Sequence, residues 1–150
     1  MGLNCSHDAF HGAYSAFNSF RQAVAAATGG SFPPHYVYEN GDVSWDDNTG
    51  LLKRHADLDE RRWYWGDDYS AETHPGLYIL FMHSDFGGEI SPEDCVLVAN
   101  DLEAALPRIA SLGWHPHGHI ALGGGYVAVT KKFIAGCRAA AEEGVPLTFG

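Results

Sequence analysis

Residues 83 to 95 read HSDFGGEISPEDC, and the end of this stretch is a helix start signal around which the rest of the chain can be interpreted. Ser91 is suited to cap a helix and Pro92 to occupy its first position. Glu93 and Asp94 follow in the first turn, where the helix dipole favours negative charge. The sequence therefore predicts a helix after Ser91, and we call the residues before Ser91 in this stretch the HSD loop.

Apolar patterns on both sides of the HSD loop predict helices. Before it, the run GLYILFMH follows Pro75. A run this short also fits a buried strand, but we favour a helix because proline suits a first helical turn. After the loop, Pro107 is expected to end or kink the next helix. The buried face of that helix is expected to carry Cys95, Val98, Leu102 and Ala105.

A first helix is predicted over residues 8 to 27, because apolar residues recur there at spacings of three and four. Ser6 or Asp8 is expected to cap it, and Gly29 and Gly30 to end it. The apolar positions are Phe10, Ala13, Phe17, Phe20, Val24 and Ala27.

A last helix is predicted over roughly residues 127 to 143, with Phe133, Cys137 and Ala140 buried. Gly144 is expected to close it, because glycine adopts the left-handed conformation that ends many helices. The following VPLTF is expected to return as an edge strand.

The remaining segments are predicted to be irregular. Residues 31 to 74 form an insertion between the first two helices, in which Asn40 and Gly41 fit the turn of a short hairpin. Residues 113 to 125 are read as a glycine-rich loop. The expected fold class is α+β and mainly helical, with about four helices packed in one domain of residues 1 to 150 and a small β hairpin or edge-strand element.

Composition excludes several classes of partner. The formal net charge is −10, with nine Lys and Arg residues against nineteen Asp and Glu residues. Such a charge repels polymeric nucleic acid but leaves room for a small anionic ligand in one Arg-lined pocket. The three cysteines are far apart, so no disulfide framework is expected and a reducing cytoplasm fits best. No apolar stretch reaches the roughly 18 residues of a membrane span, and no signal-peptide pattern opens the chain, so no membrane partner is expected.

Two groups of residues are candidates for ligand binding. Tyr14, Asn18 and Arg21 lie four and three apart, so they project from one side of the first helix, either as a solvated face or as the wall of a pocket. Residues 61 to 65, RRWYW, either plug the insertion onto the core or recognise a ligand. Arg62 can grip a phosphate, and the indole rings of this cluster can stack on a nucleobase.

The HSD loop and the histidines raise the question of a metal. In an EF-hand alignment that starts at His83, Gly88 falls correctly at position six. Imidazole is a poor calcium ligand, however, and Gly87 has no side chain to offer at position five. We assign no metal and no cofactor, and a divalent metal stays an open alternative. The residues considered for one are His83, Asp85 and Glu89 in the loop and Asp94 just after it, with His7, Asp8, His115, His117 and His119 elsewhere.

Three stretches, NCSHDAFHGAYSAFNSFRQAVA, HSDFGGEISPEDC and TKKFIAGC with PLTF, together resemble a family of small, largely uncharacterised proteins of bacteriophages and some bacteria. The resemblance covers about half of the chain. Members commonly read HSDCDGEI in the loop, whereas this chain has Phe86 and Gly87 in place of the Cys and Asp. The family has no established activity. It implies a phage setting in an infected bacterial cell, where small proteins often act on host functions, including the nucleotide signals of antiviral defence.

The favoured hypothesis is a binding protein, not an enzyme, that sequesters a nucleotide-derived small molecule. A homo-oligomer is left open. One alternative is a metal-dependent hydrolase of a similar phosphate-containing ligand, with His7, Asp85 and His119 as metal ligands and Glu89 as the base. Another is a protein that inhibits a host enzyme through its acidic surface. The expected ligand-binding residues are His7, Tyr14, Asn18, Arg21, Arg62, Trp63, Trp65, His83, Asp85 and His119. Replacement of Arg21 or Trp65 by alanine is expected to weaken binding and to leave folding intact.

Overall fold

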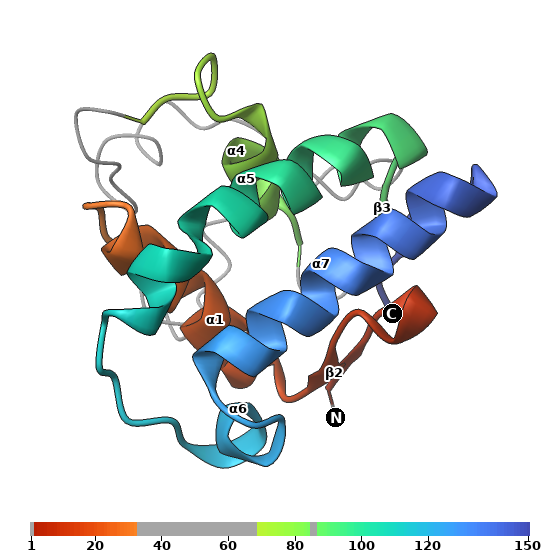
Figure 1. The fold of residues 1–150 in the computed structure, drawn as a ribbon. Helices are drawn as coiled ribbons and strands as arrows, with labels where there is room; N and C mark the ends of the chain where they lie inside the picture. Colours follow the sequence, from red (N-terminus) through yellow and green to blue (C-terminus); the bar gives the residue numbers. More distant parts are fainter. Residues whose placement is uncertain (1, 33–68, 85–86) are drawn as a thin grey trace.

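The computed structural model describes residues 2–32, 69–84 and 87–150, and these residues are mainly helical (Figure 1). The α-helices are α1 (Tyr14–Ala27), α4 (Pro75–Met82), α5 (Pro92–Ala110), α6 (Gly118–Leu122) and α7 (Tyr126–Glu143). A short 3-10 helix, η1 (Ser6–Asp8), precedes them. The strands are β1 (Leu3–Asn4), β2 (His11–Gly12), β3 (Glu89–Ile90) and β4 (Leu147–Thr148). The predicted mainly helical α+β class is confirmed.

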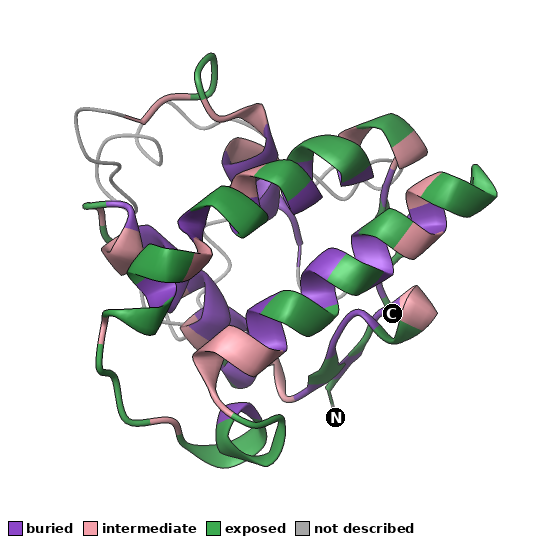
Figure 2. Cartoon of the chain, viewed as in Figure 1, coloured by how far each residue is buried: buried purple, intermediate pink, exposed green. Residues whose placement is uncertain are grey.

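The two longest helices, α5 and α7, lie side by side and run in opposite directions (Figure 1). α4 packs against α5, and α1 packs against both α5 and α7. The buried residues of these helices face inward, while their outer faces are exposed (Figure 2). The predicted apolar faces of α5 and α7 are confirmed, because their predicted core residues are all buried.

Aromatic rings fill the space between α1 and α7. The ring of Phe133 on α7 lies 6.0 Å from that of Phe17 and 5.5 Å from that of Phe20, both on α1. Phe149, which follows β4, contacts Phe17 with a centroid distance of 5.8 Å. The C-terminal segment thus contributes to the core directly.

A very close contact fixes α4 against α5. A Cβ atom added at Gly76 would lie 2.1 Å from the carbonyl oxygen of Leu97, so only glycine permits this approach. The side chain of Asp101 on α5 accepts hydrogen bonds from the backbone N–H groups of Gly76, at 2.8 Å, and Leu77, at 3.1 Å. α5 therefore caps the start of α4 from outside that helix.

Each strand pair consists of two short antiparallel strands. β1 pairs with β2, with Leu3 opposite Gly12. β3, at the end of the HSD loop, pairs with β4, with Ile90 opposite Leu147. The predicted edge strand in VPLTF is therefore confirmed, and its partner is the HSD loop itself.

The predicted start of the first helix is wrong. α1 begins at Tyr14, its cap position is Ala13, and no side chain caps it, so neither Ser6 nor Asp8 has the predicted role. The residues before it form η1 and the β1–β2 pair instead. His7 and Asp8 have positive φ angles of 57° and 58°, which a continuous right-handed helix cannot contain.

Other predicted boundaries are partly confirmed. Ser91 caps α5 by accepting a hydrogen bond from the backbone N–H of Asp94 at 3.2 Å, and Gly144 ends α7 with a φ of 71°. Pro107 does not end α5, which continues to Ala110. The glycine-rich segment 113 to 125 is not wholly a loop, because it contains α6. The hairpin at Asn40 and Gly41 lies outside the described residues. Of the helices described, none is long and apolar enough to span a bilayer.

Candidate functional site

Arg21 is a buried charged side chain at the centre of the predicted binding face. It lies on α1 and is 1% exposed. Its Nη1 donates to the carbonyl oxygen of His83 at 2.5 Å and lies 3.4 Å from that of Leu80. Its guanidinium carbon is 4.8 Å from the ring centroids of both Phe17 and Phe32. Arg21 therefore joins α1 to the C-terminal end of α4, where the HSD loop begins.

His83, the first residue of the HSD loop, is fully buried. Its Nδ1 lies 2.8 Å from the carbonyl oxygen of Ser84, and its Nε2 lies 3.3 Å from that of Glu89. Its ring packs on Phe149 with a centroid distance of 4.1 Å. Because both ring nitrogens face backbone carbonyl groups, this side chain does not suit the first ligand position of a calcium loop.

These contacts form one group, which we call the Arg21 cluster: Phe17, Arg21, Phe32, His83 and Phe149. The cluster brings together the first helix, the HSD loop and the beginning of the 31 to 74 insertion, the three parts from which the sequence predicts a ligand site. Phe32 is the last described residue before the rest of the insertion. Ser84, which His83 contacts, is the last described residue before Asp85. The predicted site residues Arg62, Trp63, Trp65 and Asp85 lie outside the described residues.

The row on α1 is an interior wall and not a solvated face. Asn18 and Arg21 are buried, and Tyr14 is half-buried. The spacing of the row is as predicted, but spacing alone cannot distinguish a face turned to solvent from one turned to a neighbouring segment. The expectation that folding tolerates Arg21→Ala is also revised, because the deletion would leave the buried carbonyl groups of Leu80 and His83 without this donor.

His7 and His119 lie near opposite ends of α7. His7 contacts Glu143, the last residue of that helix. His119, on α6, accepts a hydrogen bond from the backbone N–H of Ala13 at 2.8 Å and lies near the other end of α7. That helix is about 25 Å long at 1.5 Å per residue. The structure therefore does not bring His7 and His119 together, as the hydrolase hypothesis requires of two ligands of one metal ion.

Other candidate metal ligands have separate surroundings. Glu89 is exposed on β3, and the backbone of Asp94 takes part in the cap of α5. His115 and His117 are neighbouring rings, with centroids 5.1 Å apart, on a segment that is partly exposed. Within residues 2–32, 69–84 and 87–150, no group of three or more His, Cys, Asp and Glu side chains is arranged to hold a metal ion.

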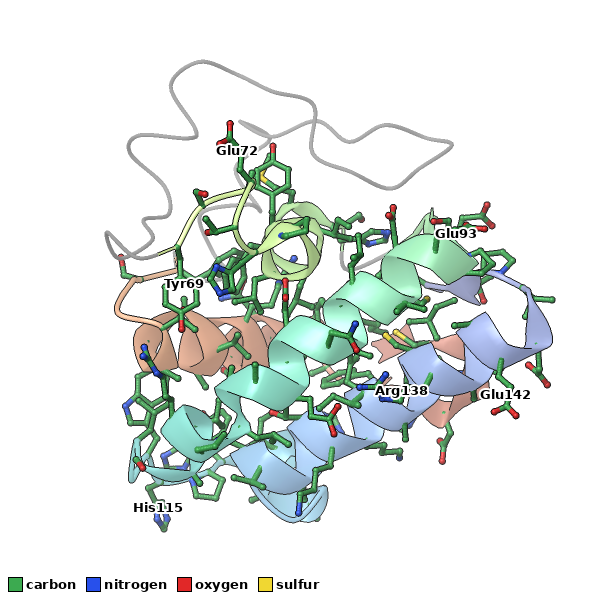
Figure 3. The ribbon with its side chains drawn as sticks, turned by 45° about the horizontal axis from the view of Figure 1, so that its top comes forward. Tyr69, Glu72, Glu93, His115, Arg138 and Glu142 are labelled. Atoms are coloured by element: carbon green, nitrogen blue, oxygen red, sulfur yellow. The ribbon has the colours of Figure 1, made fainter. Side chains whose placement is uncertain are left out.

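The structure also reveals a surface pocket that the sequence analysis missed. A pocket of about 430 Å³ lies between the C-terminal ends of α1 and α5 and includes Ala27, Arg108 and Ser111 in its lining. The Arg108 guanidinium lies 5.8 Å from the ring of Tyr69, which stacks on His74 at 4.1 Å. Figure 3 labels Tyr69, which lies on the segment that leads into α4. The sequence analysis did not single out Arg108, because no local signal links it to Tyr69.

The three cysteines, distant in sequence, are all buried as free thiols. The Cys95 thiol lies 3.6 Å from the carbonyl oxygen of Ile90. A hydrogen bond between the thiols of Cys95 and Cys137 raises the pKa of Cys137, together with burial, and lowers the pKa of Cys95. Burial raises the pKa of Cys5 to about 12. Cys5 and Cys137 are therefore neutral and poorly nucleophilic at physiological pH.

Comparisons with protein-family models, with curated proteins and with solved structures give no match for this chain. The resemblance to small phage proteins therefore stays a prediction, and the function has to be inferred from the geometry of the side chains themselves.

Proposed function

We propose that the protein binds and sequesters a nucleotide-derived small molecule, without converting it, at a site next to the Arg21 cluster. The observation that carries this proposal is the contact of Arg21 on α1 with His83 of the HSD loop and with Phe32 at the start of the insertion. Three segments separated in sequence meet there, and the insertion carries the RRWYW cluster.

The chemistry of these segments suits a nucleotide. Aromatic faces stack on a base, and guanidinium groups bind phosphate oxygens in a bidentate manner. We assign direct ligand contact to Arg62, Trp63 and Trp65 of the insertion and to Asp85 of the HSD loop. Arg21 is assigned a positioning role, because its Nη1 already binds the carbonyl oxygen of His83 and the side chain is buried.

The setting that the resemblance implies is consistent with this activity. A phage protein that removes a nucleotide signal of antiviral defence needs high affinity and no catalysis. An acidic chain also avoids competing contacts with polymeric nucleic acid, because its net charge of −10 repels the phosphate backbone.

Calorimetric titration against cyclic dinucleotides, cyclic trinucleotides and ADP-ribose derivatives tests the proposal. We expect heat of binding from one class, and chromatography of the recovered ligand should return it unchanged. Trp65→Ala should weaken binding by about 1 to 3 kcal/mol, the range for loss of a stacking face. The control is Trp114→Ala, which removes an exposed tryptophan from the segment between α5 and α6.

Three outcomes would contradict sequestration at this site. If no member of the panel produces heat, the proposal fails. A chemically altered ligand would establish a hydrolase instead. An equal loss of affinity in Trp65→Ala and Trp114→Ala would show that the effect of Trp65→Ala is not specific to the RRWYW cluster.

A further inference from the structure

Ser6, His7 and Glu143 form a hydrogen-bonded group at the surface, where η1 meets the end of α7, and we call this group the Ser6 row. The Ser6 Oγ lies 3.0 Å from the His7 Nδ1, and the His7 Nε2 contacts the Glu143 carboxylate. An ionised carboxylate can only accept hydrogen bonds, so the proton of a neutral His7 ring resides on Nε2. Nδ1 is then an acceptor, and the Ser6 hydroxyl donates its proton to it. This is the donor and acceptor order that activates a serine nucleophile.

A second contact acts on the same oxygen. The backbone N–H of Thr148, in β4, donates to the Ser6 Oγ at 2.9 Å. This donor leaves the hydroxyl proton free to point at His7. It also stabilises negative charge on the oxygen as that proton leaves, as N–H donors do at a developing alkoxide.

The backbone that carries this row is held in an unfavourable conformation. His7 and Asp8 are consecutive residues other than glycine with positive φ, a region that costs about 1 kcal/mol or more per residue. Surrounding contacts maintain it. Ala9 packs closely on Gly136 of α7, because a Cβ added at Gly136 would lie 2.4 Å from the Ala9 Cβ. The carboxylate of Asp8 also pairs with Lys132 of α7 at 3.4 Å. Backbone strain that is held in place by the rest of a fold is a common property of functional sites.

From this geometry we propose that Ser6 is a nucleophile that accepts acyl groups from small esters, with His7 as its general base and Glu143 as a positioning residue. Ser6 and His7 are only half-buried, so an ester can reach them from solvent. The carboxylate of Glu143 contacts His7 and that of Asp8 follows it in the chain, so local charge disfavours anionic substrates and neutral or cationic esters are the substrate class. This activity is independent of nucleotide binding next to the Arg21 cluster.

The reaction has two balanced steps. The Ser6 Oγ attacks the ester carbonyl carbon while its proton moves to the His7 Nδ1, and the tetrahedral intermediate expels the alcohol, which takes that proton. Water then attacks the acyl-serine ester, gives a proton to His7, and releases the carboxylic acid while the proton returns to Ser6. No oxidant, reductant or other co-reactant is required.

The test uses a fluorophosphonate probe, which labels activated serines, together with hydrolysis of p-nitrophenyl acetate. Wild-type protein should be labelled, peptide mass spectrometry should locate the label on Ser6, and Ser6→Ala should abolish it. His7→Gln should slow labelling by about 100-fold or more, the usual contribution of a general base. Glu143→Gln should slow it less, and Glu143→Asp should recover part of the rate at an unchanged melting temperature.

Two control variants separate reactivity from structure. Arg138→Gln removes an exposed ion pair between α7 and α5, outside the row, and should leave labelling unchanged. Ser19→Ala removes a hydroxyl on α1 that donates to the Ser15 carbonyl oxygen of the same helix, and should also be neutral. An unlabelled wild type, a label that persists in folded Ser6→Ala, or a rate that is the same in His7→Gln would each overturn the proposal.

Discussion

The Arg21 cluster and the Ser6 row both contain polar side chains from distant parts of the chain, but the two regions use them in opposite ways. In the Arg21 cluster the donors are directed at backbone carbonyl groups, and the charged group is enclosed by aromatic rings. In the Ser6 row the side chains are directed at one another and remain in contact with solvent.

This difference separates stability from reactivity. A buried donor that satisfies carbonyl groups contributes to the free energy of folding, because its removal leaves polar groups without partners in the interior. A half-exposed row of side chains contributes little to stability, since water can replace each partner. We therefore expect substitutions in the first region to affect unfolding, and substitutions in the second to affect chemistry.

The largest effect is expected for Arg21→Ala. The substitution removes a large buried side chain together with a donor to the His83 carbonyl, so unfolding free energy should fall by about 3 to 5 kcal/mol. Urea denaturation followed by circular dichroism measures this change. Arg138→Ala, which removes an arginine from an exposed ion pair with Glu103, is the matched control and should cost less than about 1 kcal/mol. Similar losses in both variants would show that the burial of Arg21 adds nothing to its contribution to stability.

A pH effect of up to a few kcal/mol is expected from Cys5, the neighbour of Ser6. Burial raises its pKa from 9.0 to about 12, so the thiolate forms at lower pH in the unfolded chain. The stabilisation from this thiol is complete below pH 9 and is lost as pH rises from 9 toward 12, by roughly 1.4 kcal/mol per unit.

Urea denaturation of wild type and Cys5→Ala across this pH range isolates the effect, because tyrosine and lysine residues titrate equally in both proteins. The wild type should lose more stability than the variant as pH rises. Parallel curves would show that the Cys5 thiol is not protected, and that the contrast with the accessible Ser6 hydroxyl does not hold.

A medium effect is expected for Gly76→Ala. The added methyl group would collide with the Leu97 carbonyl and separate α4 from α5, which should cost about 1 to 3 kcal/mol. Because α4 leads into the HSD loop, the change should also weaken any ligand binding at that loop. Gly87→Ala is the control for stability, since no atom of the described residues lies within 4 Å of a Cβ added there. A neutral Gly76→Ala would mean that the position of α4 adjusts freely.

The smallest effect on stability is expected for His7→Gln, at less than about 1 kcal/mol, because its partner Glu143 is exposed. Thermal melting followed by circular dichroism measures it, and the labelling rate of Ser6 is measured on the same samples. A loss of 2 kcal/mol or more would assign His7 to the structural class of Arg21.

The helices were predictable where packing and local signals agree. The Ser91-Pro92 start, the apolar face of α5 and the Gly144 end of α7 each follow from the preferences of single residues combined with a helical period. The start of α1 was not predictable in this way. Phe10 fits the helical period of α1 and is buried, but it reaches the core from the segment between η1 and β2. A periodic pattern records which residues are buried and not the path of the backbone between them.

The candidate sites show the same limit. The sequence led to the hypothesis that Arg21 and the HSD loop belong to one binding site, and the structure brings them into contact. It could not indicate that Arg21 would bind carbonyl groups. Every residue has a backbone carbonyl group, so the residue type does not show which of them accepts a hydrogen bond. The Ser6 row depends on Glu143, which is 136 residues from His7, and nothing local to either residue reports that contact.

The hydrogen bond from Thr148 to Ser6 joins residues that are 142 positions apart in the chain. Contacts of such high sequence separation form late, because the entropy of closing the loop must be offset by structure already present. The Ser6 oxygen receives its N–H donor only where β4 lies against η1. A reactive serine would therefore itself report that these two distant segments have come together.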